Sequence, residues 1–169
     1  MKIKSFMMMM VAAAALVIGA SSCGDDKDEP EVALAVQVAG SYTGQETLTV
    51  DGEPDEDTAT FEFTKSSDNA IDMVIPKYGM GGMMTLPALT VKNIVLTKTP
   101  TTVSDNSITG KLASYAGTVT NADGAEKAYT ISDVTVFFDV DAKKVVATFK
   151  MKYGNMPFAF EGQFIGTKK

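Results

Sequence analysis

Apolar and polar residues alternate along most of the chain beyond residue 40, which is typical of strands with one buried face. Turn-forming Gly, Asn, Asp and Pro interrupt the alternation about every ten residues. This spacing predicts an all-β sandwich or barrel, preceded at residues 32–36 by a short helical turn or an extended lead-in. The expected strands are residues 41–50, 58–65, 70–77, 89–98, 107–120, 127–140, 143–153 and 156–167.

The last two expected strands offer the most detailed pairing. Gly154-Asn155 between them is a strong signal for a two-residue hairpin turn, which would fix the register. Paired residues share a face of the sheet, and this register collects apolar residues on one face. The predicted pairs are Tyr153 with Met156, Met151 with Phe158, Phe149 with Phe160, Ala147 with Gly162, and Val145 with Phe164. The opposite face would carry Thr148, Lys150, Lys152, Glu161 and Gln163.

Eight consecutive strands with mostly short links predict an eight-stranded antiparallel up-and-down barrel, which can hold its own side chains or one small ligand. Loops alternate between the ends of such a barrel. One rim is therefore expected to gather residues 51–57, 78–87, 121–124 and 154–155, and with them every mature methionine except Met73. The candidate ligand-binding residues at this rim are Tyr78, Met80, Met83, Met84, Met151, Tyr153, Met156 and Phe158.

The N-terminus predicts export. Lys2 and Lys4 precede an apolar run that is short for a membrane span, so residues 1–22 are expected to be a signal peptide. The Ala-Ser-Ser-Cys ending resembles a bacterial lipobox, which implies cleavage before Cys23 and lipidation of that residue; ordinary cleavage that leaves a free thiol is the alternative. Residues 23–38 would form an acidic tether and residues 39–169 the barrel domain. The acidic GDDKDEPE segment resembles the signal that sends some lipoproteins to the outer face of the outer membrane.

Charge and residue inventory narrow the possible functions. Without the signal peptide the chain has a net charge of about −8 and no Arg, which argues against binding nucleic acid. The chain has no His, and lipidation of Cys23 would leave no thiol. Catalysis by Ser-His-Asp or Cys-His groups is thereby excluded, and so are zinc sites that need His or Cys. We therefore expect no enzyme activity and no cofactor, although carboxylates, Lys and Tyr remain.

Three other interpretations compete with the ligand-binding rim. Met80, Met83, Met84 and Met156 could bind Cu(I), but packing of flexible methionines is favoured because no His or Cys assists. The carboxylates of residues 51–57 could hold Ca²⁺, but a solvated turn is favoured because a calcium loop's Gly and terminal Glu are lacking. Tyr42, Tyr115 and Tyr129 could stack on sugars, but single aromatics in strands are more often core residues.

Three segments carry a family resemblance: AGSYTG at residues 39–44, YGMGGMM with LTVKNI at 78–94, and FAFEGQFIG at 158–166. Through them, nearly all of residues 39–166 resembles the lipocalin-like, calycin-like β-barrel domain of small gut-bacterial lipoproteins. Gly40-Ser41-Tyr42 is similar to the Gly-x-aromatic opening of lipocalin-type barrels. The resemblance implies a barrel and no established reaction.

These observations together predict a non-enzymatic lipoprotein, anchored through Cys23 in the outer membrane and exposed at the cell surface. It would bind a small apolar or amphipathic ligand at the barrel mouth, as a monomer and without metal or nucleic acid. The alternative is a structural or interaction lipoprotein whose self-filled barrel contacts a protein or glycan partner.

Overall fold

The computed structural model describes residues 31–80, 84–102 and 104–169, and Val32–Lys169 form one compact unit. One helix is followed by ten strands in the described residues. Their bounds are α1 Leu34–Val38, β1 Gly40–Val50, β2 Glu53–Ser67, β3 Ala70–Ile75, β4 Tyr78–Met80, β5 Met84–Leu86, β6 Leu89–Lys98, β7 Ser107–Thr120, β8 Glu126–Asp139, β9 Lys144–Tyr153 and β10 Phe160–Lys168. The described helix is too short to cross a membrane.

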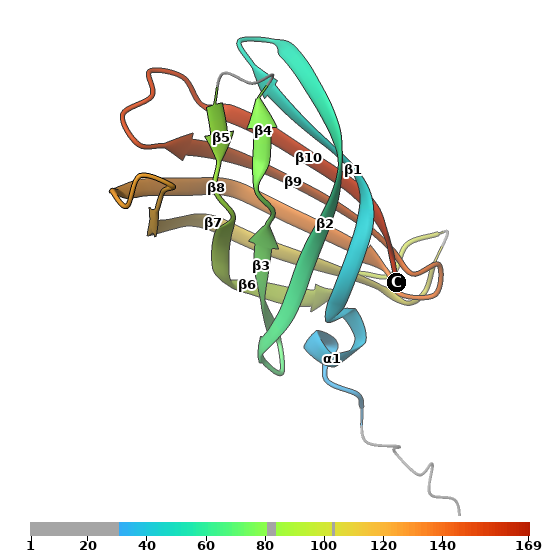
Figure 1. Cartoon of the computed structure of the whole chain (residues 1–169). Helices are drawn as coiled ribbons and strands as arrows, with labels where there is room; N and C mark the ends of the chain where they lie inside the picture. The colour runs from blue at the N-terminus through green and yellow to red at the C-terminus, as the bar shows by residue number, and fades with distance from the viewer. Residues whose placement is uncertain (1–30, 81–83, 103) are drawn as a thin grey trace, which may run out of the picture. The chain divides into compact units, whose positions relative to one another are not determined.

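Eight of the strands close into an antiparallel barrel in the order β1-β10-β9-β8-β7-β6-β3-β2 (Figure 1). Each strand pairs with its neighbours in sequence once β4 and β5 are set aside as a separate two-stranded hairpin. The predicted fifth strand is one continuous strand, β7. The eight-stranded up-and-down barrel is therefore confirmed, and its loops alternate between the two ends.

The helix α1 closes one end of the barrel. Ala35 and Val38 are fully buried, and the Tyr42 hydroxyl donates a 3.0 Å hydrogen bond to the Val38 carbonyl. From the last strand, the Lys168 ammonium donates to the Gln37 carbonyl at 3.3 Å and lies 5.9 Å from the centre of the Tyr42 ring. These contacts join both ends of the described chain to one end of the barrel. The opposite end, which carries the β1–β2, β4–β5, β7–β8 and β9–β10 connections, is called the mouth below.

Aromatic side chains fill the barrel from the helix end to its middle. Tyr42 and Phe63 meet edge to face at 5.4 Å, and Phe138 contacts Phe63 at 5.1 Å. Further along, the rings of Phe61 and Phe164 stack at 4.1 Å. Aromatic pairs of this kind contribute about 0.5–1.5 kcal/mol beyond the burial of their area. The predicted core positions of Tyr42 and Tyr129 are confirmed, while Tyr115 packs at the edge of the core.

The second strand begins earlier than the sequence predicted. We expected residues 51–57 to form a solvated turn, but β2 starts at Glu53 and pairs with β1 from Val50↔Glu53 onward. Asp51 and Gly52 alone make the turn, with φ of 49° and 85°. Two positive φ values in a two-residue loop define the type I′ turn, which matches strand twist and favours Asp-Gly. The acidic residues after it therefore continue a strand.

The predicted register of the last hairpin is wrong by two residues. Phe160 pairs with Met151, Gly162 with Phe149 and Phe164 with Ala147, and the connection spans residues 154–159. The Phe149 ring lies over Gly162, where a Cβ atom would come within 2.3 Å of the ring. The predicted register would have placed Phe160, instead of Gly162, opposite Phe149 and so would not allow this packing. A slip of two residues leaves each side chain on its face, so the faces predicted for β9 and β10 are confirmed. Met156 and Phe158, predicted on the apolar face, lie in the connection and are partly buried.

The barrel wall loosens toward the mouth. The β2–β3 ladder runs from Glu62↔Val74 to Ser67↔Ala70, and the β6–β7 ladder covers only Val95–Lys98 on β6. Beyond these ladders, the β3–β6 hairpin continues as β4–β5, without a described ladder to β2 or β7. The Tyr129 hydroxyl on β8 bridges part of this interval with a 2.7 Å hydrogen bond to the Thr90 carbonyl on β6. This hydrogen bond thus crosses a part of the wall that has no described backbone ladder between β6 and β7.

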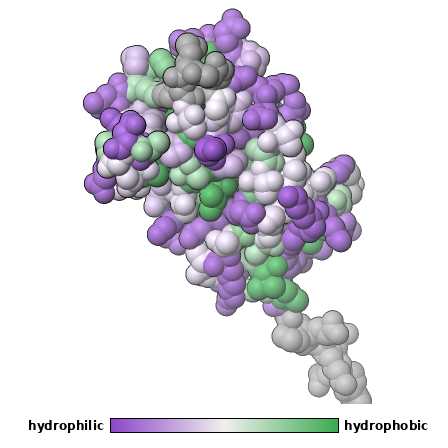
Figure 2. Space-filling view, in the orientation of Figure 1, coloured by the Kyte–Doolittle hydropathy of each residue, from purple (hydrophilic) through white to green (hydrophobic). Residues whose placement is uncertain are grey.

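The face of the barrel shown in Figure 2 is mostly hydrophilic, with an apolar area near α1. The exposed large apolar residues in the described chain include Val32 and Val36, whose side chains are about half exposed. Both belong to the segment that enters or forms α1. The apolar area thus lies at the end of the barrel away from the mouth.

Candidate functional site

The structure brings part of the predicted rim together. Tyr78, Met151 and Tyr153 are buried in one apolar cluster, and Met156 and Phe158 pack against it at its edge. Phe158 meets the buried Phe160 ring edge to face at 5.5 Å. Burial raises the pKa of the Tyr153 hydroxyl. These five side chains come from β4, β9 and the β9–β10 connection, as the alternation of loops predicted.

The methionines of the β4–β5 hairpin are only partly described. Met80 and Met84 pair as the last described residues of β4 and β5, and the placement of their side chains is not described. Met83 lies outside the described residues. Their part in ligand binding or in Cu(I) binding therefore stays a prediction.

A buried glutamate in β1 is the feature that the sequence interpretation missed. Inward-facing positions of this strand include Tyr42, Glu46 and Leu48, because alternate residues of a strand share a face. Glu46 has no exposed surface, and neither its Oε1 nor its Oε2 has a hydrogen-bond partner among the described residues. The signal was available as a lone acidic residue at an alternate position between Tyr42 and Leu48.

Burial dominates the electrostatics of Glu46. It raises the pKa of the carboxyl from 4.5 to about 7, and the negative charge of Asp57 adds to the effect. Asp57 is the cross-strand partner of Glu46 on β2. The described lysines are exposed except Lys168, which is half-buried at the helix end. No described cation therefore balances Glu46 within the barrel.

Two further carboxylates lie between Glu46 and the solvent at the mouth. Asp57 and Asp55 lie on the inward-facing side of β2, opposite Glu46 and Leu48, and both are exposed because the strand extends past the packed core. The buried Tyr78 hydroxyl lies among them, next to the Asp55 carboxylate. Burial raises its pKa, and so do the negative charge of Asp55, a side-chain hydrogen bond to Asp55, and the negative charges of Glu46 and Asp57. The mouth thus combines an apolar lining with a line of acidic groups.

One aromatic residue lies next to the buried carboxyl and belongs to a larger cluster of rings. Phe164 is the partner of Glu46 on β10, and Phe61 stacks on Phe164. Phe149 lies 6.4 Å from Phe61. A carboxylate at the edge of such a cluster suits a positively charged group, because ring faces also attract cations.

The acidic line does not resemble a metal centre. Within the described residues, no three His, Cys, Asp or Glu side chains converge in a way that could hold a metal ion. Alternation along β2 separates Asp55 from Asp57 by roughly 6–7 Å of strand. Residues 53–57 form a strand that keeps their carboxylates apart, so the structure does not support the Ca²⁺ site considered for residues 51–57.

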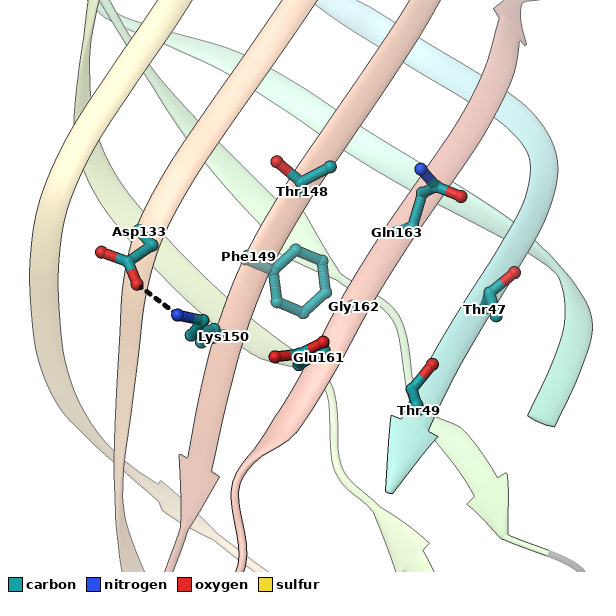
Figure 3. A pocket seen from close by; sticks show the side chains of 9 residues that line it. All are labelled: Thr47, Thr49, Asp133, Thr148, Phe149, Lys150, Glu161, Gly162 and Gln163. Carbon is teal, nitrogen blue, oxygen red and sulfur yellow. Dashed lines mark ion pairs between the residues drawn. The ribbon is translucent and has the colours of Figure 1, made fainter. Parts of the chain in front are cut away.

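A shallow polar groove of about 430 Å³ lies on the outer wall across β1, β8, β9 and β10 (Figure 3). Its only charged pair within the described residues is Asp133 with Lys150, at 3.0 Å, and hydrogen bonding to Asp133 raises the pKa of Lys150. Four of the residues that line the groove belong to the polar face predicted for the last hairpin. Phe149 and Gly162 also line the groove. The lining residues are Thr47, Thr49, Asp133, Thr148, Phe149, Lys150, Glu161, Gly162 and Gln163. We assign this groove to the solvated outer face of the barrel.

Comparisons with known proteins agree with this architecture. The family model of the calycin-like beta-barrel domain matches residues 38–167. A crystal structure of a Bacteroides fragilis chain, named as a putative outer membrane protein, has the same fold with a TM-score of 0.59 and 19% sequence identity. The alignment covers 81% of this chain and 53% of that one, so this chain spans about half of its length. A search of the curated proteins found no match. This chain belongs to the calycin-like β-barrel domain family.

Proposed function

We propose that this protein is a non-enzymatic binding protein that takes up a small apolar or amphipathic ligand at the mouth of its barrel. The observation that carries the proposal is the unpaired Glu46 carboxyl, whose charge acts on the buried hydroxyl of Tyr78 in β4. Tyr78, Met151 and Tyr153 supply buried apolar surface toward the mouth. Binding sites in barrels commonly combine an apolar lining with a few polar groups that orient the ligand. The loose wall beside β4–β5 supports entry there, because side-chain contacts separate more readily than a ladder.

The competing function is a structural or interaction lipoprotein with a closed interior. The packing of Tyr42, Phe63 and Phe138 favours it for the half of the barrel near α1. This packing does not extend to a partner for Glu46. The two functions therefore differ at the mouth, and uptake of an apolar probe separates them.

Uptake of a neutral fluorescent probe, N-phenyl-1-naphthylamine, tests ligand binding. The chain has no Trp, so emission from the bound probe is read against a low protein background. We expect saturable uptake by the mature chain carrying Cys23→Ala, and several-fold weaker uptake after Phe158→Ser. The matched control is Ile165→Ser on the outer wall, where the side chain is 51% exposed. No uptake by the folded protein, or equal loss in both variants, favours the closed barrel.

We also propose that Cys23 anchors the protein in the outer membrane, with the mouth directed away from the lipid. The lipobox-like sequence before Cys23, the acidic segment after it and the outer-membrane description of the Bacteroides fragilis protein support the location. Since α1 lies opposite the mouth, an anchor that precedes it leaves the mouth accessible.

Replacing Cys23 by Ala in the full chain should move the protein from the membrane fraction to the soluble fraction of the cell envelope. Loss of the acyl chains removes the stable attachment that several such chains provide. Fractionation followed by immunoblotting measures the shift, with Cys23→Ser as a second variant. Retention of both variants in the membrane would rule out anchoring through this residue.

A further inference from the structure

Glu46 has a chemical environment that the packing of the barrel does not explain. It has no exposed surface, both carboxylate oxygens lack hydrogen-bond partners in the described chain, and no described lysine reaches it. Buried polar groups in folded proteins nearly always have partners, and an unpaired buried charge is strongly unfavourable. A carboxyl held in this state needs a partner that the described residues do not supply.

The surroundings of Glu46 indicate what that partner is. Phe164 lies opposite it on β10, with Phe61 stacked at 4.1 Å and Phe149 at 6.4 Å from Phe61. Aromatic faces and a carboxylate are both attractive to an organic ammonium group and poorly suited to an anion. The Tyr78 hydroxyl, next to Asp55, adds an oxygen that can accept a hydrogen bond from the same group.

The charges between Glu46 and solvent favour the same partner. Asp57 and Asp55 occupy the inward-facing side of β2 next to the mouth, and the mature chain as a whole is acidic. Field lines from such a line of carboxylates raise the local concentration of cations at the entrance. The apolar residues Leu48, Leu86 and Met151 are buried and belong to the same core cluster, which suits an apolar tail or ring.

We propose that the ligand of this barrel is an amphipathic amine, whose protonated nitrogen pairs with the Glu46 carboxylate while its apolar part lies among the buried side chains of the mouth. This inference rests on the proposed binding function and specifies its ligand class. Asp57 and Asp55 guide the cation inward, and the phenyl rings of Phe164 and Phe61 line its position. The pairing supplies the missing partner of Glu46 and lowers the electrostatic penalty of its burial.

The pairing gives binding a definite pH dependence. The groups that face Glu46 are Asp57 and Asp55 from β2 and the Tyr78 hydroxyl from β4, while Phe164 from β10 carries no charge. Burial and Asp57 raise the pKa of Glu46 to about 7, so the carboxylate form is lost as pH falls through that value. Affinity for an amine should therefore weaken between about pH 8 and about pH 6, whereas affinity for a neutral alcohol should not.

Isothermal titration calorimetry with decylamine, decanol and decanoate tests the inference on the mature chain carrying Cys23→Ala. We expect decylamine to bind at least about tenfold more tightly than decanol near pH 8, and decanoate to bind most weakly. Glu46→Gln should remove this preference, so that decylamine and decanol bind with equal affinity to the variant. The matched control is Glu56→Gln, an exposed outward-facing position on β2 whose carboxylate accepts a hydrogen bond from Gln45, and it should preserve the preference.

Other outcomes would overturn the inference in distinguishable ways. Equal binding of decylamine and decanol, with N-phenyl-1-naphthylamine still taken up, refutes the amine and keeps the binding function. Tighter binding of decanoate as pH falls would instead make protonated Glu46 a donor to an anionic ligand. Calcium binding that Glu46→Gln abolishes would replace the amine with a metal ion. Failure of all three ligands and of the probe on the folded protein refutes the binding function itself.

Discussion

Gly44→Ala should lower the free energy of unfolding by more than about 3 kcal/mol, at the upper end of what overpacking usually costs. A Cβ atom at this position would lie 1.9 Å from the Ile165 carbonyl oxygen and 2.5 Å from the Gly166 Cα. Both are backbone atoms of β10, so the methyl group can be accommodated only by separating β1 from β10. This pairing joins the first and last strands and closes the barrel. Urea unfolding followed by tyrosine fluorescence or circular dichroism measures the loss.

Gly79→Ala is the matched control for the stability loss expected of Gly44→Ala. Gly79 also lies in a strand, β4, but no atom lies within 4 Å of the position where its Cβ would be. Its substitution should change stability by less than about 1 kcal/mol. If Gly44→Ala does not fold, Gly162→Ala provides a milder case, because its Cβ meets the Phe149 ring rather than backbone. A Gly44→Ala protein as stable as wild type would show that β1 and β10 do not approach as closely as described.

Glu46→Gln should gain stability relative to the wild type as pH rises. The difference between the two proteins in free energy of unfolding should grow by about 3 kcal/mol, in favour of the variant, from near pH 4 to near pH 8. The unfolded chain loses the Glu46 proton near 4.5, while the folded chain holds it until about 7. Between these values the folded state binds more protons, so the stability of the wild type falls as pH rises. Above about 7 the carboxylate is charged in both states and the full penalty remains. Glutamine has a similar shape and no charge, so its contribution does not change with pH.

Urea unfolding of both proteins at several pH values measures this difference. The buried amide that Glu46→Gln introduces can itself lack partners, so the informative quantity is the change with pH rather than the offset at any one pH. Glu56→Gln, on the outer wall, is the control for removing a carboxylate from an exposed position of β2. A difference between wild type and Glu46→Gln that stays constant from about pH 5 to about pH 8 would contradict the buried, uncompensated carboxyl.

Strand positions and faces were predictable because they depend on a period of two residues. In β9, Ala147, Phe149 and Met151 point inward at the positions that the alternation indicated. The register of β9 with β10 was not predictable in the same way, since a slip of two residues preserves both faces. What selects the observed register is three-dimensional packing, such as the Phe149 ring over Gly162.

The acidic start of β2 shows a different limit. Gly, Pro, Asp and Glu are depleted in strands, so propensity placed residues 53–57 in a loop. The Asp51-Gly52 turn can close a hairpin alone, and pairing with β1 then carries the strand through Pro54 and its acidic neighbours. Tertiary pairing overrides the local preference there. It also converts an expected solvated turn into inward-facing carboxylates beside the mouth.

The sequence predicted the apolar residues of the candidate site but not its buried carboxyl group. The alternation of loops brought Tyr78, Tyr153 and Met151 to one end, as the structure shows. Glu46 was hidden because Gln45 and Thr47 beside it are also polar, so the segment shows no clear apolar face at that point. The sequence marks it as inward-facing only by its alternate position between Tyr42 and Leu48. Closure of the barrel, with Phe164 opposite Glu46, shows that the side chain lies inside.

The most direct measurement is a titration of the Glu46 carboxyl carbon by NMR, with the resonance assigned by comparison with Glu46→Gln. We predict a midpoint near pH 7 in the free protein and a clear downward shift of that midpoint when decylamine is added, because a bound cation stabilises the carboxylate. A midpoint near the ordinary value of 4.5, unchanged by decylamine, would contradict both the buried unpaired carboxyl and its pairing with an amine.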